Sequence, residues 1–260
     1  AISPTGANGV GAPITLIASL LAGLGAGLML SLFAENSDLT YRTAGQLERD
    51  VRAPCLGVCP VVPRGLLKRR AARDGGQQIQ RVLSGLRRDR LGKVVLVTSA
   101  LADEGKTTMA SHLAAVLRDR GARVLLIANP ALAGPLGAEL VGGDGAGTRP
   151  AAQPSEANPA SGLAVMAPPS DTRLEAVLTS ERGRYDTIVV DGRSILAGEQ
   201  GGMLADLADS VLLVVGWGET RAPSLRTALD TLGGNASKIV GAVLNKVDVK
   251  RHRLYDYDSY

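Results

Sequence analysis

The sequence predicts a doubly wound α/β protein with a parallel sheet, preceded by one transmembrane helix. Three observations support this prediction. Apolar runs alternate with amphipathic segments from residue 93 onward, a loop ending in Gly-Lys-Thr joins one such pair, and residues 13–33 carry no charge. Strands that are apolar throughout are covered on both faces, and in α/β proteins such strands alternate with helices.

Each element can be placed by its apolar pattern. We expect strands at Val94–Thr98, Val124–Ile127, Leu163–Met166, Thr187–Val190, Val211–Val215 and Ile239–Leu244. We expect helices at Lys106–Arg118, Thr172–Glu181, Gln200–Ala208 and Pro223–Leu232. The stretch Gly134–Ser161 is rich in Gly, Ala, Pro and Ser, which indicates a flexible surface loop. Folds of this kind bind ligands at the carboxyl ends of their strands.

Composition limits the alternatives. The 260 residues are 45% hydrophobic but only 3% aromatic, so Leu, Val and Ala must form the core of one globular domain plus extra segments. Ten Arg and Lys residues lie between Arg64 and Lys93, facing only two acidic residues. This run is either a solvated face or a patch for anionic lipid, and we expect no nucleic-acid partner. Cys55 and Cys59 could form half a metal site, but no second pair follows, which favours a short apolar strand.

Residues 13–33 are long enough to cross a bilayer core as a helix. A signal peptide would need a basic stretch before it, and residues 1–12 have no charge; a core helix would be amphipathic. Gly23 and Gly27 could allow close helix packing, or could reflect the frequency of Gly in such spans. The basic residues nearest the span all follow it, which places the amino end outside and the remainder in the cytoplasm: Arg42, Arg49, Arg52, Arg64 and Lys68.

The loop from Ser99 to Thr107 has the spacing of a phosphate-binding loop (P-loop), Gly-x-x-x-x-Gly-Lys-Ser/Thr, with Ala100 at the first glycine position. Gly105 allows backbone amides to approach a phosphate at a helix N-terminus. Lys106 would reach the outer phosphates, and Thr107 would offer its hydroxyl to Mg²⁺. The nucleotide-contacting residues predicted here are Ala102, Asp103, Glu104, Gly105, Lys106, Thr107, Thr108 and Asn245.

Two further positions complete the predicted site. Asp191 ends a buried strand, so its carboxylate could hold Mg²⁺ opposite Thr107; with Lys106 it forms the predicted catalytic pair. Asn245 lies in Asn-Lys-x-Asp, which GTPases use to recognise guanine, although the segment after Val190 lacks Asp-x-x-Gly. Asn245 could instead contact a purine generally, and the spacing leaves ATP or GTP open.

Several stretches together resemble one family. They are "YRTAGQLERDVRAPCLGVCPVVPRG", "TSALADEGKTT", "YDTIVVDG", "LADSVLLVV" and "GAVLNKVDVKRHRLYDYDSY". With the apolar stretch before them, they are similar to the bacterial tyrosine autokinases (BY-kinases). These are fused to, or partners of, the polysaccharide co-polymerases that regulate chain length and export of exopolysaccharide and capsule. The resemblance extends over nearly the whole chain.

The resemblance implies ATP and Mg²⁺ as cofactors, a ring-like homo-oligomer, and polysaccharide polymerase or export machinery as partners. It implies the bacterial inner membrane, with the P-loop domain in the cytoplasm. It also implies phosphate transfer to Tyr255, Tyr257 and Tyr260 of a neighbouring subunit. The resulting organisation is an extracytoplasmic end (1–12), a transmembrane helix (13–33), a connector with a basic helix (34–92), a nucleotide-binding domain (93–250) and a tyrosine-containing tail (251–260).

The chain departs from the family at important positions. Ala128 and Pro130 stand where the family has two aspartates, one for Mg²⁺ and one to activate the tyrosine hydroxyl. Ala102 and Asp103 replace a common Pro-Gly, and only Arg81 remains of a Glu-x-x-Arg-x-x-Arg motif for ring contacts. Losing a general base costs on the order of 10²–10⁴ in rate. We therefore expect an ATP-binding regulator with weakened or lost kinase chemistry; an active autokinase and a non-catalytic structural subunit are the alternatives.

Overall fold

The computed structural model describes residues 12–36, 39–61, 69–128, 162–198, 200–248 and 251. The chain forms two units, Ala1–Leu39 and Thr40–Tyr260. The predicted loop Gly134–Ser161, Pro130 and the three tail tyrosines lie outside the described residues.

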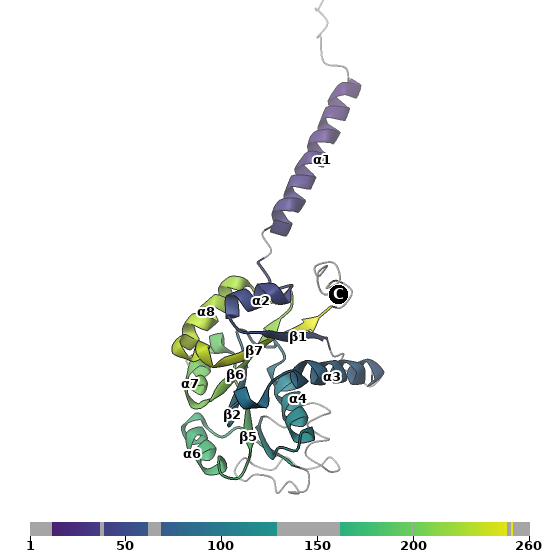
Figure 1. The fold of residues 1–260 in the computed structure, drawn as a ribbon. Helices are drawn as coiled ribbons and strands as arrows, with labels where there is room; N and C mark the ends of the chain where they lie inside the picture. Colours follow the sequence, from purple (N-terminus) through teal and green to yellow (C-terminus); the bar gives the residue numbers. More distant parts are fainter. Residues whose placement is uncertain are drawn as a thin grey trace, which may run out of the picture. The chain divides into compact units, whose positions relative to one another are not determined.

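The first unit contains one helix, α1 (Ala12–Asn36), labelled in Figure 1. Its described side chains are exposed, including nine large apolar ones between Ile14 and Leu30. Across the described part of the chain, no helix combines the length and the apolarity needed to span a bilayer. The predicted span 13–33 is therefore not confirmed.

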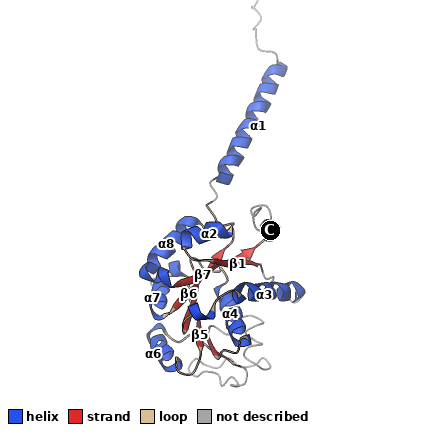
Figure 2. Ribbon diagram, in the orientation of Figure 1, coloured by secondary structure: helices blue, strands red, loops and turns tan. Residues whose placement is uncertain are grey.

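The second unit is built on one seven-stranded sheet in the order β1-β7-β6-β2-β5-β3-β4, in which every neighbouring pair is parallel. Figure 2 shows strands of this sheet in red with helices around them in blue. The strands are β1 (Cys55–Pro60), β2 (Val94–Ser99), β3 (Val124–Ile127), β4 (Leu163–Met166), β5 (Thr187–Asp191), β6 (Ser210–Gly216) and β7 (Ile239–Val247). The helices are α2 (Ala44–Val51), α3 (Arg69–Ser84), α4 (Lys106–Asp119), α6 (Asp171–Glu181), α7 (Gln200–Leu207) and α8 (Ala222–Leu232). Short 3₁₀ turns are η2 (Arg88–Arg90), η4 (Ile195–Ala197) and η5 (Gly233–Lys238).

Alternate residues of each strand enter two separate apolar clusters, because successive side chains point to opposite faces of a sheet. On one face, Val95 and Val97 pack with α3 and α4 through Leu83 and Leu113. On the other, Leu96 packs in the cluster that contains Leu47 of α2, Leu178 of α6, Ala205 of α7 and Leu225 of α8. Figure 1 shows the same division of helices between the two sides. Helices on both faces confirm the predicted doubly wound parallel α/β class.

The segment before residue 93 contains the short strand expected around Cys55 and Cys59, a helix within the basic run, and one helix, α2, that the apolar pattern does not predict. Helix α2 begins with a capping box, in which Thr43 Oγ1 accepts from Gln46 N while Gln46 Oε1 accepts from Thr43 N. Strand β1 pairs with β7 at the sheet edge, and Cys55 and Cys59 both lie on it as free thiols. This edge strand, α2 and α3 belong to the same compact unit as the P-loop.

The Asp209 carboxylate accepts hydrogen bonds from backbone amides at the amino end of β2, and its contribution to the stability of the fold can be tested. Its Oδ2 accepts from Lys93 N at 2.9 Å and Val94 N at 2.8 Å, and its Oδ1 accepts from Arg182 at 3.2 Å. Burial raises the pKa of this carboxyl, but the hydrogen bonds from Val94 N and Arg182 outweigh that effect and leave the pKa below its ordinary value.

We predict that Asp209→Ala lowers the free energy of unfolding by about 1–2 kcal/mol at neutral pH. Because the folded-state pKa is lowered, this contribution is present above the ordinary Asp pKa and is lost as the pH falls through the folded value. Urea unfolding followed by Trp217 fluorescence measures the difference. The control is Asp206→Ala, whose exposed carboxylate bonds only to Asn235 among the described residues and should change stability little. Equal effects of the two variants would contradict the account.

Candidate nucleotide site

Four neighbouring strands bring the predicted site residues to one edge of the sheet. Strand β2 leads into the P-loop and α4, and its Val97 lies opposite Asp191 of β5. On the other side, Ser99 lies opposite Val214 of β6, and Gly216 of β6 lies opposite Asn245 of β7. Carboxyl ends of parallel strands lie at the same edge, so the loop, the carboxylate and the amide meet although they are distant in sequence.

The P-loop backbone adopts left-handed conformations at Asp103 (φ 59°) and at Gly105 (φ 97°). Asp103 occupies the position where the family commonly has glycine, and a short polar residue tolerates this conformation better than most. At Gly105 a side chain would not fit, since an added Cβ would lie 2.1 Å from Asn245 Nδ2. Helix α4 begins at the next residue, so the first amides of the helix are available to an anion.

Lys106 is folded onto its own loop. Its Nζ donates to Ser99 Oγ at 3.0 Å and to Leu101 O at 3.3 Å. Burial lowers the pKa of this ammonium, and the nearby carboxylates of Glu104, Asp191 and Asp103 act in the opposite direction. An incoming phosphate would offer the ammonium a charged acceptor in place of these neutral oxygens, and charge-assisted hydrogen bonds are stronger.

Thr107 and Asp191 lie side by side across the β2–β5 pair. Thr107 Oγ1 donates to Asp191 Oδ2 at 2.6 Å, while Asp191 Oδ1 is buried and accepts no hydrogen bond from any described residue. Burial raises the pKa of Asp191, against the opposing effects of the Thr107 hydrogen bond and the Lys106 charge. A buried carboxylate oxygen without a partner, next to a hydroxyl, fits the oxygen ligands that Mg²⁺ prefers.

Protein side chains alone do not form a metal cage here. Among the described residues, no three His, Cys, Asp or Glu side chains gather closely enough to hold a metal ion. Mg²⁺ commonly binds through one or two protein ligands plus phosphate oxygens and water. The Thr107–Asp191 pair therefore fits Mg²⁺ that arrives with a nucleotide.

The position after β3 carries no catalytic group. Ala128 is 1% exposed, its N–H donates to Met166 O at 3.0 Å, and its methyl group belongs to the apolar cluster against α4. A methyl group neither binds a cation nor accepts a proton. Pro130, at the second family position, is outside the described residues.

The side chains of Asn245 and Glu104 both form hydrogen bonds to other parts of the protein. Asn245 is buried and its Nδ2 donates to Glu104 O at 2.7 Å, so its amide supports the loop. The Glu104 carboxylate is 1% exposed and bonds to Leu101, Gly216 and Thr220. No sequence signal places Gly216 or Thr220 beside the loop, because each is more than 100 residues away in the chain. Ala102 and Asp103 are exposed, and Thr108 O accepts from His112 Nδ1 if that nitrogen carries the proton.

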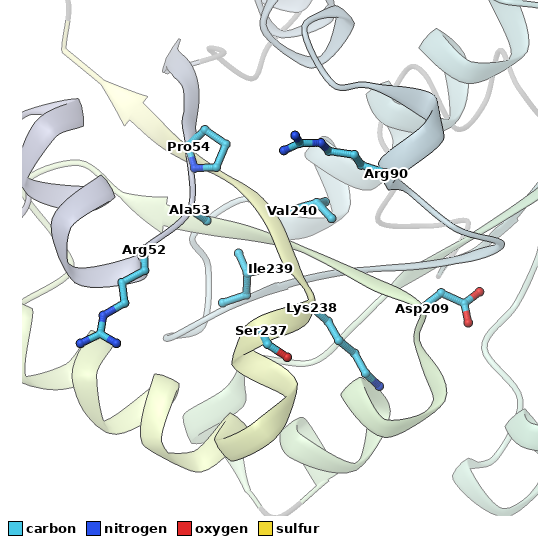
Figure 3. Close-up of a pocket in the computed structure, with 9 residues that line it drawn as sticks. All are labelled: Arg52, Ala53, Pro54, Arg90, Asp209, Ser237, Lys238, Ile239 and Val240. Carbon is cyan, nitrogen blue, oxygen red and sulfur yellow. The ribbon is translucent and has the colours of Figure 1, made fainter.

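A hollow of about 500 Å³ lies at the amino ends of the strands, opposite the end that carries the P-loop (Figure 3). It is lined by residues at or before the amino ends of β1, β2, β6 and β7, among them Pro54, Arg90, Asp209 and Val240. The P-loop follows the carboxyl end of β2. This hollow is therefore separate from the candidate nucleotide site.

Comparison with known proteins now adds to this geometry. No family model matches the chain. The chain is 30% identical over 188 residues to the succinoglycan biosynthesis transport protein ExoP of Rhizobium meliloti (strain 1021), covering 64% of this chain and 24% of that protein. It is 29% identical over 186 residues to the tyrosine-protein kinase YwqD of Bacillus subtilis (strain 168), covering 65% of this chain and 78% of that protein.

The solved kinase domain of VpsO is also similar, with 26% identity, a TM-score of 0.54, and coverage of 71% of this chain and all of that chain. The chain is thus similar to bacterial tyrosine kinases in both sequence and fold. The family resemblance read from the P-loop and strand-end motifs is thereby confirmed. The matched region covers about a quarter of the length of ExoP, so the similarity extends to only part of that protein.

Gly105 and Asn245 allow a test of the loop geometry. We predict that Gly105→Ala lowers the free energy of unfolding by about 2–4 kcal/mol, because the added methyl group meets the Asn245 amide and alanine resists a positive φ. Asn245→Ala alone loses one hydrogen bond. The double variant should be more stable than the sum of the two losses implies by about 1 kcal/mol, since the steric contact is gone. Strict additivity in urea unfolding would contradict this packing.

Asp191 offers a test of the buried carboxylate. We predict that Asp191→Asn raises the free energy of unfolding of the nucleotide-free chain by about 1 kcal/mol at neutral pH, because it removes a charge with one unpartnered oxygen. The folded-state pKa is raised, so the wild-type carboxylate destabilises the fold above that pKa and gains a proton as the pH falls. The advantage of the variant should therefore disappear in acid. A variant that is less stable than wild type at neutral pH would refute the assignment.

Proposed function

We propose that this chain is a membrane-anchored, ATP-binding regulator of exopolysaccharide or capsule chain length and export whose tyrosine kinase chemistry is weakened or lost. The observation that carries the proposal is a complete phosphate cradle beside an apolar Ala128. Gly105, Lys106, Thr107 and Asp191 supply the groups for phosphate and Mg²⁺, while the described position after β3 has no carboxylate.

In this proposal, the first amides of α4 and the Lys106 ammonium hold the outer phosphates. Thr107 Oγ1 and the Asp191 carboxylate hold Mg²⁺, which would neutralise phosphate charge when bound. A buried Asp191 oxygen without a partner in the described structure supports this role. Adenine is proposed as the base on the family likeness; the buried Asn245 amide, already bonded to Glu104 O, supports the loop in this account.

Attachment to the bacterial inner membrane is part of the proposal. Residues 13–33 would anchor the chain, with 1–12 outside and the P-loop domain in the cytoplasm, and the exposed apolar side chains of α1 support attachment. The basic residues of the 64–93 segment would contact anionic lipid. Homo-oligomers and polysaccharide polymerase or export machinery are the proposed partners, on the likeness to ExoP, a succinoglycan biosynthesis transport protein.

An active autokinase is the second candidate, favoured by the likeness to the tyrosine-protein kinase YwqD. In that function, Lys106 and Asp191 would serve the transfer and Tyr255, Tyr257 and Tyr260 would accept phosphate. The exposed side chain of Asp103 is the acidic group of the loop that is free to act as an alternative base, because the Glu104 carboxylate is buried in hydrogen bonds. A structural subunit without nucleotide is the third possibility.

Lys106→Met tests the three functions together. We predict that the full chain binds an ATP analogue in the presence of Mg²⁺, and that Lys106→Met weakens binding at least about tenfold because phosphate loses its cation. Lys93→Met, at the amino end of β2, is the matched control and should bind as wild type. Calorimetric titration measures affinity, and a phosphotyrosine assay with ATP measures transfer.

The outcomes separate the candidates. Binding without phosphotyrosine supports the regulator. Phosphotyrosine on the tail that disappears in Lys106→Met would establish the autokinase and contradict lost chemistry. No measurable affinity for ATP or GTP in wild type would remove both and leave the structural subunit.

A further inference from the structure

The Glu104 carboxylate is buried and accepts hydrogen bonds at both of its oxygens. Its Oε2 accepts from Leu101 N at 2.7 Å, inside the P-loop. Its Oε1 accepts from Gly216 N at 2.9 Å and from Thr220 Oγ1, in the loop that joins β6 to α8. Both oxygens therefore face donors, and the side chain is 1% exposed.

The loop at residues 216–221 also forms hydrogen bonds with residues 40–42, the segment that follows α1 in the sequence. Tyr41 N donates to Thr220 O at 3.2 Å, and Gly218 N donates to Tyr41 O at 3.0 Å. The Trp217 indole N–H donates to Arg42 O at 2.9 Å. An antiparallel bridge between residues 40 and 221 extends this contact. The same short loop thus holds residues 40–42 and the Glu104 carboxylate.

Asn245 makes a parallel connection between the same two loops. The Asn245 side-chain Nδ2 donates to Glu104 O at 2.7 Å, and the Asn245 backbone carbonyl accepts from Trp217 N at 2.8 Å. The P-loop is therefore attached to residues 216–220 through both the side chain and the backbone of Glu104. Such a connected set of hydrogen bonds can transmit a shift of one segment to the other.

We propose that Glu104 is a positioning residue that holds the P-loop in its phosphate-binding shape and links that shape to the backbone at residues 40–42. The proposal deepens the proposed function, because it rests on phosphate binding by this loop. A carboxylate is required at this position, since both of its oxygens accept. Glutamine has nearly the same shape but would turn an amide group toward a donor and leave a buried polar group unsatisfied.

The linkage has a reciprocal consequence. If docking of residues 40–42 stabilises the binding shape of the loop, then nucleotide binding stabilises the docked state of residues 40–42 by the same factor. The Tyr41 and Gly218 amides report that docking directly, because each is a donor in the contact between the segment and the loop. Their protection against hydrogen exchange can be measured without any nucleotide.

The test uses the full chain and four variants. Glu104→Gln replaces one of the two acceptor oxygens by an NH₂ donor, and Thr220→Val removes the hydroxyl with little change of shape. Thr220→Ser keeps the hydroxyl, and Thr227→Val deletes an exposed α8 hydroxyl that bonds to Pro223 O. We expect Glu104→Gln and Thr220→Val to speed exchange of the Tyr41 and Gly218 amides at least about fivefold and to weaken ATP-analogue binding about tenfold. The two controls should stay within about twofold of wild type.

The hydrogen-exchange measurement tests the link between Glu104 and residues 40–42 without any nucleotide. Unchanged exchange at Tyr41 and Gly218 in both test variants would overturn the linkage, even if the loop amides themselves were loosened. Unchanged affinity in both variants of a chain that binds ATP would overturn the positioning role. If the wild-type chain binds no nucleotide, the proposed function fails, yet faster exchange in the nucleotide-free variants still supports the Glu104 link. If Glu104→Gln fails to fold, the Thr220→Val and Thr220→Ser pair gives the decision.

Discussion

The hydrogen bond between Thr107 and Asp191 is the interaction on which the rest of the site depends. It exists because β2 and β5 are adjacent parallel strands, so the residue that follows the P-loop glycine and lysine meets the end of a strand more than 80 positions later. The resulting pair places one hydroxyl and one carboxylate oxygen together, and it leaves a second carboxylate oxygen buried without a partner. Burying a carboxylate oxygen without a partner is costly, and a bound cation would offset that cost.

The surrounding structure keeps this pair in register with the phosphate loop. A left-handed glycine allows the loop to turn under the Asn245 amide, and Glu104 fastens the loop to the end of β6. Lys106 is held by neutral oxygens of its own loop, where phosphate oxygens can replace them. By contrast, Ala128 packs as part of the core. The groups proposed to bind phosphate thus lie at or after the ends of buried strands, while Ala128, after β3, contributes only packing.

Much of this fold could be predicted from the sequence, because each strand of the parallel sheet is an unbroken apolar run. The predicted strands Val124–Ile127 and Leu163–Met166 have the same bounds in the structure, and the other predicted strands differ from it by at most a few residues at either end. Helix α2 was missed although Thr43 and Gln46 form a capping box, since its short polar sequence has no long apolar stripe. The role of Glu104 could not be read from the sequence, because its partners Gly216 and Thr220 approach only when β6 lies beside β2. The Asn-Lys-x-Asp motif predicts a base contact for Asn245, but it does not predict the hydrogen bond from the Asn245 amide to the loop backbone.

The most direct measurement is the structure of the full chain bound to a non-hydrolysable ATP analogue and Mg²⁺. The account predicts phosphate oxygens on the backbone amides at the start of α4 and on Lys106 Nζ, with Mg²⁺ contacting Thr107 Oγ1 and liganded by Asp191 directly or through water. Glu104 should remain bonded to Gly216 and Thr220. An analogue bound elsewhere, or a loop still closed by the Lys106 contacts to Ser99 and Leu101 at saturating analogue, would contradict it.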